Sequence, residues 1–103
     1  MGVDCSRFVQ TIFKLNGIRL LRDAYQQATQ GKEMTNLSEI KGGEVAFFKN
    51  EQERITQVGI LLSNNQIIHA SGKVKVDNID EEGIINVQTG KRTHQLHSMK
   101  RFF

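Results

Sequence analysis

The first apolar residues of the chain recur with the period of an α-helix. Counted from Cys5, they fall at i+3, i+4, i+7 and i+8, which is one face of an amphipathic helix: Phe8, Val9, Ile12 and Phe13. The pair Asn16-Gly17 follows this face and tolerates left-handed backbone geometry. The pattern predicts a helix over about residues 4–16, with Cys5 at its leading edge.

A second helix is predicted before the pattern changes. The helix is predicted over residues 22–30, with Ala24, Tyr25 and Ala28 on one side, and it ends at Gly31. Beyond Gly42-Gly43, short runs rich in β-branched and aromatic residues predict strands at 44–48, 56–62, 66–71, 73–79 and near 95–103. We therefore expect an α+β fold: helices first, then an antiparallel β-sheet of about five strands, with the helices covering one face.

Two of these strands are predicted to form a β-hairpin around residues 63–65. A two-residue turn would place Gln57 and His69 on opposite faces, whereas a three-residue loop or a bulge puts them on the same face. Gly59, inside the first of the two strands, predicts a bulge or a close approach by another backbone, for which the start of the first helix is the natural candidate.

Composition limits the classes of protein to which the chain can belong. Its 103 residues, 38% of them hydrophobic, suffice for one domain, and no apolar run approaches the roughly twenty residues of a membrane-spanning helix. One cysteine excludes an internal disulfide and a cysteine-based zinc site. The net charge of +3 comes from basic residues scattered along the chain. They are not clustered as on a nucleic-acid-binding surface. The sequence also shows no signal peptide or lipidation motif.

Cys5 is a candidate nucleophile because of its place at the start of a helix. The first N–H groups of a helix have no partner within it, and the helix dipole adds about half a positive charge there, so a thiolate is favoured over a thiol. The alternative is a small buried hydrophobic residue, since free cysteine is among the most buried residue types. Position alone leaves both interpretations open.

His69 lies within a predicted core strand, whereas His94 and His97 belong to the polar C-terminal stretch. A cysteine and an imidazole are the minimum set for thiol catalysis, because the imidazole takes the thiol proton and later gives it to the leaving amine. The alternative is a histidine buried in the sheet for structural reasons alone.

Five blocks in order carry a resemblance to a known family. They are Asp-Cys-Ser-x-Phe-Val-Gln from residue 4, Leu-x-Arg-Asp-Ala-x-x-Gln from 20, Gly-Gly-Glu-Val-Ala-Phe-Phe from 42, x-Val-Gly-Ile from 57 and Ile-His-Ala-Ser from 68. Over residues 3–71, with a weaker echo in 93–102, the chain resembles the NlpC-type cell-wall peptidases, which are papain-like cysteine hydrolases of bacteria.

The resemblance implies an endopeptidase that hydrolyses amide bonds in peptidoglycan stem peptides, commonly between D-glutamate and a diamino acid, without a metal or other cofactor. Its partners would be these stem peptides, with no nucleic acid and no insertion into a membrane. Relatives are secreted or belong to the bacterial envelope, often beside a separate wall-binding domain. We expect a monomer.

The resemblance also implies roles for individual residues. Cys5 matches the nucleophile, and its backbone N–H would help form the oxyanion hole. Asp4 and Ser6 match positions that hold the free amine of the stem peptide, and Arg22 matches a substrate or surface contact. His69 matches the third polar member of the triad, which orients the catalytic imidazole.

The position of the catalytic base departs from the family, because Gln57 stands where relatives carry a histidine. A glutamine amide does not take up a proton near neutral pH, so it can neither deprotonate Cys5 nor protonate the departing amine. Three further residues replace a glycine, a proline and an aspartate of the family pattern: Arg7, Leu21 and Glu44. We expect a single domain over residues 1–103 that lacks the upstream helix and the aromatic-Gly-Gly segment of relatives.

Three hypotheses about function remain open at this point. The first is a cell-wall peptidase impaired by Gln57, favoured by Cys5, His69, Asp4 and Ser6. The second is a catalytically inactive relative that binds cell-wall peptides or a protein partner, and the third is a shortened or engineered copy without a selected function. The family assignment requires that Gln57 and His69 both point toward Cys5, which needs the three-residue loop.

Overall fold

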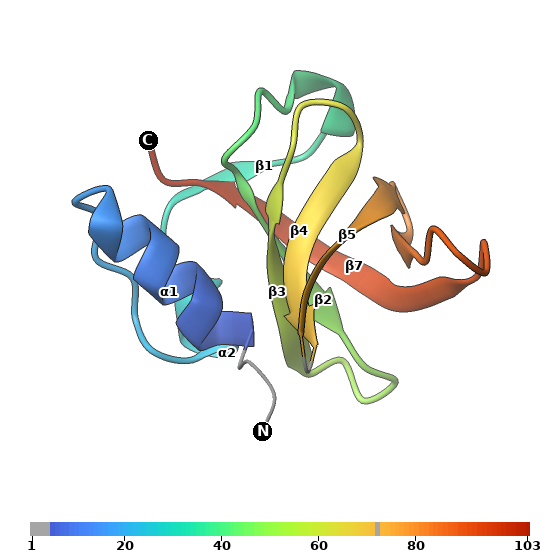
Figure 1. Ribbon diagram of the computed structural model, residues 1–103. Helices are drawn as coiled ribbons and strands as arrows, with labels where there is room; N and C mark the ends of the chain where they lie inside the picture. The colour runs from blue at the N-terminus through green and yellow to red at the C-terminus, as the bar shows by residue number, and fades with distance from the viewer. Residues whose placement is uncertain (1–4, 72) are drawn as a thin grey trace.

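The chain begins with two helices and continues with strands (Figure 1). The structure, a computed structural model, describes residues 5–71 and 73–103. Within these ranges, the first elements are α1 (Cys5–Leu15), α2 (Ala24–Gln27), β1 (Lys32–Met34) and a short 3-10 helix, η1 (Leu37–Glu39). They are followed by β2 (Val45–Lys49), β3 (Ile55–Leu61), β4 (Gln66–Ser71), β5 (Lys73–Asp80), β6 (Gly83–Ile85) and β7 (Arg92–Arg101).

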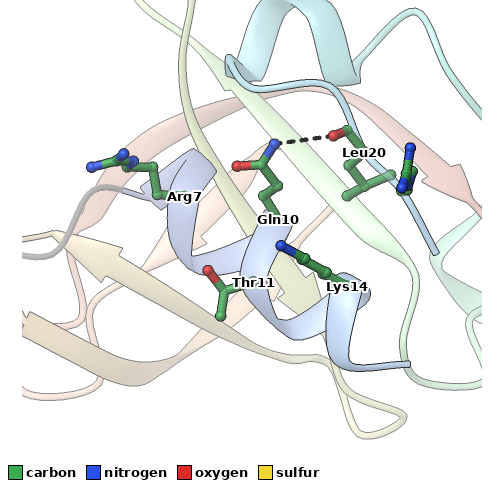
Figure 2. A pocket seen from close by; sticks show the side chains of 6 residues that line it. Arg7, Gln10, Thr11, Lys14 and Leu20 are labelled. Atoms are coloured by element: carbon green, nitrogen blue, oxygen red, sulfur yellow. Dashed lines mark hydrogen bonds between the residues drawn. The ribbon is translucent and has the colours of Figure 1, made fainter. Parts of the chain in front are cut away.

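Helix α1 matches the first predicted helix and buries part of its apolar face. Val9 and Phe13 are buried, and Gly17, at φ 80°, follows the helix end. The loop after α1 is tied back to the helix, because the Gln10 side-chain amide donates a hydrogen bond of 3.1 Å to the Leu20 carbonyl (Figure 2). Both helices lie on one side of the sheet and contact β3 (Figure 1).

Helix α2 has four residues and is shorter than the predicted span of 22–30. Asp23 is its N-cap residue, and the Asp23 N–H donates to the side-chain oxygen of Gln26 at 3.1 Å. Beyond Gln27 the backbone bonds tighten, since the N–H groups of Thr29 and Gln30 donate to carbonyls three residues earlier. This tightening ends the helix.

The strands close into a barrel. Hydrogen-bonded neighbours run in the order β1-β7-β2-β3-β4-β5-β6, and β6 pairs with β7 as well. In the described residues, β2 to β7 therefore form a closed antiparallel ring of six strands, and β1 is added on β7. The expected α+β fold with an antiparallel sheet of about five strands is wrong, because the strands close into a ring.

The ring closes because β7 is long and bent. Its ten residues pair with β6 at one end, with β2 along the middle and with β1 at the other end. Register shifts at Phe47/Phe48 and at Ile84/Ile85 increase the local bend of the strands. A Cβ on Gly83 would lie 1.7 Å from the His94 carbonyl oxygen, so only glycine lets β6 approach β7 this closely. The pattern of hydrophobic residues does not show that β6 pairs with β7, which is what closes the ring.

The core has two parts, one inside the barrel and one between the barrel and the helices. The inner cluster is made of Met34, Ala46, Phe48, Leu61, Ile67, Ile79, Ile84 and Met99. The outer cluster is made of Val9, Phe13, Leu20, Val45, Phe47, Val58 and Ile60. Alternate residues of β2 thus serve the two clusters, as the period of two in a strand requires. The outer cluster fixes α1 against β3.

The hairpin between β3 and β4 has a three-residue loop. Leu61 pairs with Ile67, and the Leu62 N–H donates to the Gln66 carbonyl at 2.8 Å, which leaves residues 63–65 as the loop. The prediction of an odd loop is confirmed. The close approach at Gly59 comes from β4, because a Cβ on Gly59 would lie 2.9 Å from the Ile68 carbonyl oxygen. The expectation that α1 makes this approach is wrong.

Glu44, which replaces the aspartate of the family pattern, is fully buried at the start of β2. Its carboxylate accepts hydrogen bonds from the N–H groups of Lys41 (3.0 Å) and Gly42 (2.8 Å) and from the Arg101 guanidinium (2.7 Å). Burial raises the pKa of this carboxyl, but the hydrogen bonds from Arg101 and the backbone outweigh it, so the net pKa is lowered. The ion pair therefore joins the start of β2 to the end of β7.

We predict that Arg101→Ala lowers the free energy of unfolding by about 3 kcal/mol, because it leaves the buried Glu44 carboxylate without its counter-ion. Urea denaturation followed by circular dichroism measures this loss. The matched control is Arg92→Ala: Arg92 pairs with Asp80 and Glu82 at the surface, where a pair contributes about 0–1 kcal/mol. Equal losses in the two variants would contradict the assignment.

Candidate active site

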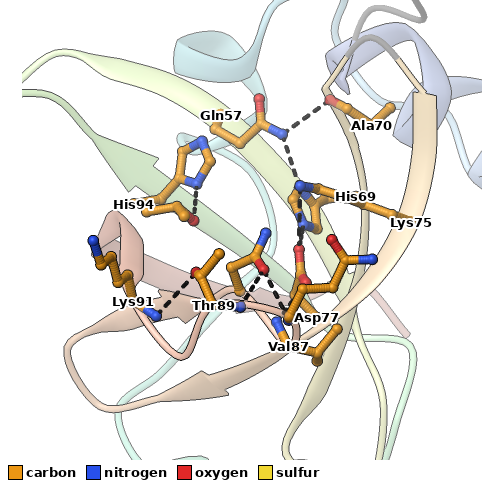
Figure 3. Close-up of polar contacts among 12 residues, drawn as sticks. Gln57, His69, Ala70, Lys75, Asp77, Val87, Thr89, Lys91 and His94 are labelled. Carbon is orange, nitrogen blue, oxygen red and sulfur yellow. Dashed lines mark hydrogen bonds and ion pairs between the residues drawn. The ribbon is translucent and has the colours of Figure 1, made fainter.

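Gln57 on β3 and His69 on β4 lie on the same face of the sheet and touch (Figure 3). The Gln57 side-chain nitrogen lies 3.2 Å from Nδ1 of His69 and donates a second hydrogen bond of 2.9 Å to the Ala70 carbonyl. Both side chains are buried, with exposed fractions of 7% for Gln57 and 0% for His69. The prediction that the two residues share a face is confirmed.

Asp77 on β5 extends this pair to a chain of three side chains (Figure 3). Its Oδ2 lies 2.8 Å from Nε2 of His69, and its Oδ1 accepts a hydrogen bond from the Val87 N–H at 3.1 Å. Burial raises the pKa of Asp77, but the hydrogen bonds from His69 and Val87, with the charge of Lys75, outweigh it and lower the net pKa. Asp77 is therefore an anion in a buried position.

The hydrogen bonds of Gln57 decide which ring nitrogen of His69 carries the proton. The Ala70 carbonyl only accepts, so the Gln57 nitrogen, not its oxygen, must face Ala70 and His69. Nδ1 of His69 then accepts from Gln57, and Nε2–H donates to Asp77. Both ring nitrogens of His69 are engaged.

Cys5 begins α1 and lies against the start of β3. Its Sγ is 3.9 Å from the carbonyl oxygen of Thr56, the residue before Gln57, and its side chain is half-buried. The outer cluster brings the start of α1 to this strand, since Cys5 and Phe8 pack at its edge. The candidate nucleophile and the candidate base position are thus contributed by adjacent parts of the fold.

Ser6 and Arg22 are the two predicted substrate-binding residues that the structure describes, and they lie on segments joined by the side chain of Gln27. Ser6 is buried, and its carbonyl accepts a hydrogen bond of 3.1 Å from the fully buried Gln27 of α2. Arg22 is exposed ahead of α2, and Asp4 lies outside the described residues. Gln27 also donates to the Leu21 carbonyl at 2.8 Å, so it connects the first turn of α1 to the segment before α2.

A family model for the NlpC/P60 family matches residues 1–93. The chain belongs to the NlpC/P60 family. It is 39% identical over 84 residues to a probable endopeptidase NlpC homolog of Haemophilus influenzae, covering 79% of this chain and 43% of that protein. It is 38% identical over 71 residues to the gamma-D-glutamyl-L-lysine dipeptidyl-peptidase of Bacillus subtilis, covering 67% of this chain and 24% of that protein.

The fold agrees with this assignment to the NlpC/P60 family. The solved structure of NlpC2 from Trichomonas vaginalis superposes with a TM-score of 0.77 at 23% sequence identity, over 95% of this chain and 36% of that one. The chain spans less than half the length of each of these three relatives. At this level of identity the superposition shows a shared fold.

His94 is a residue of this NlpC/P60 chain whose place the sequence did not reveal. It lies on β7, half-buried, with its ring centroid 5.9 Å from that of His69 and 6.1 Å from that of Phe48. Burial lowers the pKa of His94, as do His69 and Lys75, whereas Asp77 raises it. The polar C-terminal stretch that contains His94 forms β7, and the closed ring brings this residue to His69.

Residues 5–71 and 73–103 contain no group of three or more histidine, cysteine, aspartate or glutamate side chains arranged to hold a metal ion. Neither is any helix in these ranges long and apolar enough to span a membrane.

We predict that Asp77→Asn flattens the dependence of stability on pH. Because the folded-state pKa of Asp77 is lowered, its ionisation contributes stability above the unfolded pKa of about 3.9, and this contribution is lost as the pH falls through the folded-state value. Urea denaturation between about pH 6 and pH 3 should therefore show a smaller fall in unfolding free energy for Asp77→Asn than for the unmodified protein.

The control for this experiment is Glu51→Gln, which removes an exposed carboxylate in the turn between β2 and β3. It should leave the slope of stability against pH close to that of the unmodified protein. If Asp77→Asn and the unmodified protein gave parallel curves, Asp77 would not be the buried anion described above.

Proposed function

We propose that this chain is a cysteine endopeptidase domain for amide bonds of peptidoglycan stem peptides, of the D-glutamyl to diamino acid type, with turnover impaired by Gln57. The observation that carries the proposal is the buried chain of hydrogen bonds from Gln57 through His69 to Asp77. The Cys5 sulfur, at a helix start, lies 3.9 Å from the carbonyl oxygen of Thr56, the residue before Gln57. The substrate class is supported by the names of the relatives, which include an endopeptidase and a gamma-D-glutamyl-L-lysine peptidase.

The chemistry of this proposal needs a proton acceptor beside Cys5. The thiol must lose its proton to attack the amide carbon, and the departing amine must gain one. Gln57 occupies the base position, and its amide can do neither. His69 is fully buried with both ring nitrogens hydrogen-bonded, so it orients Gln57 as it would orient an imidazole.

The helix start supplies the other requirement, which is stabilisation of the negative charge that develops on the carbonyl oxygen. We propose that backbone N–H groups at the start of α1, including that of Cys5, form the oxyanion hole. We propose that the stem peptides of the bacterial cell wall are the partner and that the protein acts in the envelope or outside the cell.

A second candidate function is a non-catalytic receptor for the same peptides. The specific observation in its favour is that the Gln57 amide fits its surroundings fully, with its nitrogen bonded to both His69 and Ala70. A site that lacks a general base but keeps the hydrogen bonds around the base position can still bind a peptide.

We predict that Gln57→His raises the rate of stem-peptide cleavage by about 100-fold or more, because a general base contributes typically 10²–10⁴-fold. The measurement is release of products from a defined stem tetrapeptide, followed by mass spectrometry. Gln57→Asn, which introduces a shorter amide, is the matched control and should give no gain.

Cys5→Ala, made in both backgrounds, tests whether the thiol carries the reaction. Cleavage by the unmodified chain as fast as by Gln57→His would contradict impairment by Gln57, and cleavage that survives Cys5→Ala would contradict the assignment of the nucleophile. If calorimetry shows peptide binding while neither the unmodified chain nor Gln57→His turns the peptide over, the receptor function replaces the peptidase.

A further inference from the structure

Gln27 is a buried side chain that joins the two helices next to the candidate nucleophile. It belongs to α2, is 0% exposed, and donates two hydrogen bonds from one nitrogen: 3.1 Å to the Ser6 carbonyl and 2.8 Å to the Leu21 carbonyl. Ser6 follows Cys5 in the first turn of α1 and is buried as well. The contact therefore acts, from outside α1, on the backbone beside the thiol.

The two acceptors fix the direction in which the Gln27 amide faces. Both are carbonyl oxygens, which only accept hydrogen bonds, so the NH₂ group must face them. Within residues 5–71 and 73–103, the Oε1 of Gln27 is buried without a hydrogen-bond partner. An apolar side chain of similar size would fill the same space without this unpaired oxygen, whose burial is costly. What the glutamine adds is its pair of donated hydrogen bonds.

The far end of this link is anchored. Ala24 and Ala28 of α2 pack at the edge of the outer cluster. The Leu21 N–H donates to the Gln30 side chain at 2.8 Å, while the Leu21 carbonyl accepts from Gln27. The segment before α2 is therefore held at both backbone groups of one residue, and Gln27 connects this fixed segment to the first turn of α1.

The first turn of α1 decides where the thiol lies and how it reacts. The Cys5 Sγ is 3.9 Å from the Thr56 carbonyl oxygen, on the strand that carries Gln57. A reacting group displaced by about 1 Å can lose 10²-fold in rate. An ordered first turn also keeps the positive end of the helix dipole at the sulfur, where it favours the thiolate. Both effects depend on the order of this turn.

We propose that Gln27 is a positioning residue for the thiol: it holds the first turn of α1 through the Ser6 carbonyl and so sets the place and the reactivity of Cys5. Gln27 acts through the backbone and not on the reacting atoms. As a role in peptide cleavage, this inference rests on the proposed peptidase function. As an effect on the reactivity of the thiol, it can be measured without any cleavage.

The test follows the alkylation of Cys5 by iodoacetamide as a function of pH. Gln27→Met removes both donated hydrogen bonds and keeps an unbranched side chain of similar length. The midpoint of the pH dependence should move to higher pH by about 0.5 unit, because a disordered helix start stabilises the thiolate less. Gln27→Asn keeps the amide but is too short to bridge both carbonyls, so it should give the same move and serves if Gln27→Met does not fold.

The matched control is Gln10→Met. Gln10 makes the same kind of bond between α1 and the same loop, 3.1 Å to the Leu20 carbonyl, but further along the helix (Figure 2). Its loss should lower the stability measured by urea denaturation and leave the alkylation midpoint in place. A purely structural role of Gln27 would make the two methionine variants alike in both measurements.

A second measurement uses the Gln57→His background and the stem tetrapeptide. Adding Gln27→Met there should lower kcat by about tenfold with KM changed by less than about twofold, because Gln27 positions the thiol and is too deeply buried to hold the peptide.

The outcomes separate this proposal from the proposed function. If Gln57→His cleaves no peptide while the alkylation midpoint moves as expected, the peptidase function fails and the positioning role stands. An unchanged midpoint in a folded Gln27 variant, or an equal move in Gln10→Met, would overturn the positioning role even if Gln57→His is active.

Discussion

The rest of the structure depends on the pairing of β7 with two strands at once. Its hydrogen bonds to β2 on one side and to β6 on the other turn a row of strands into a ring. Closure removes the free sheet edges that would otherwise expose unpaired N–H and C=O groups, and it creates an interior from which water is excluded. The inner cluster fills part of that interior, and the outer surface of the same strands is left to receive α1.

A closed interior imposes a strict condition on polar side chains, because each buried donor or acceptor needs a partner. The row Gln57, His69 and Asp77, on three consecutive strands, meets this condition through hydrogen bonds within the row and to the backbone. Glutamine at the base position satisfies the packing and the hydrogen bonds while lacking the acid-base chemistry of a histidine. Leu21, like Gln57, differs from the family pattern and forms hydrogen bonds that suit its surroundings. Its N–H, which a proline would lack, donates to the Gln30 side chain at 2.8 Å.

Much of the local structure could be predicted from the sequence. The helical period after Cys5 predicted α1, and the β-branched runs predicted β2 to β5 and most of β7. The family resemblance singled out Gln57 at the base position, and its side-chain chemistry shows that it cannot act as a base. The strand β1 has three residues and escaped notice, and the pairing of β6 with β7, which closes the ring, could not be foreseen. Asp77 and His94 were missed at the candidate site because strand register brings Asp77 to His69 and closure of the ring brings His94 to His69.

By itself, then, the sequence determined where the first helix and the longer strands lie, which family the chain resembles, and that Gln57 cannot carry a proton. Tertiary structure alone decided which face of each strand is inside. In β5, apolar and polar residues alternate, and this pattern would suit a strand with its valines in the core. Instead, Val74 and Val76 are 47% and 42% exposed, and Asp77 is 2% exposed. The physical reason is that alternation allows two faces, and register, closure and the hydrogen bond from His69 together choose the one that buries the carboxylate.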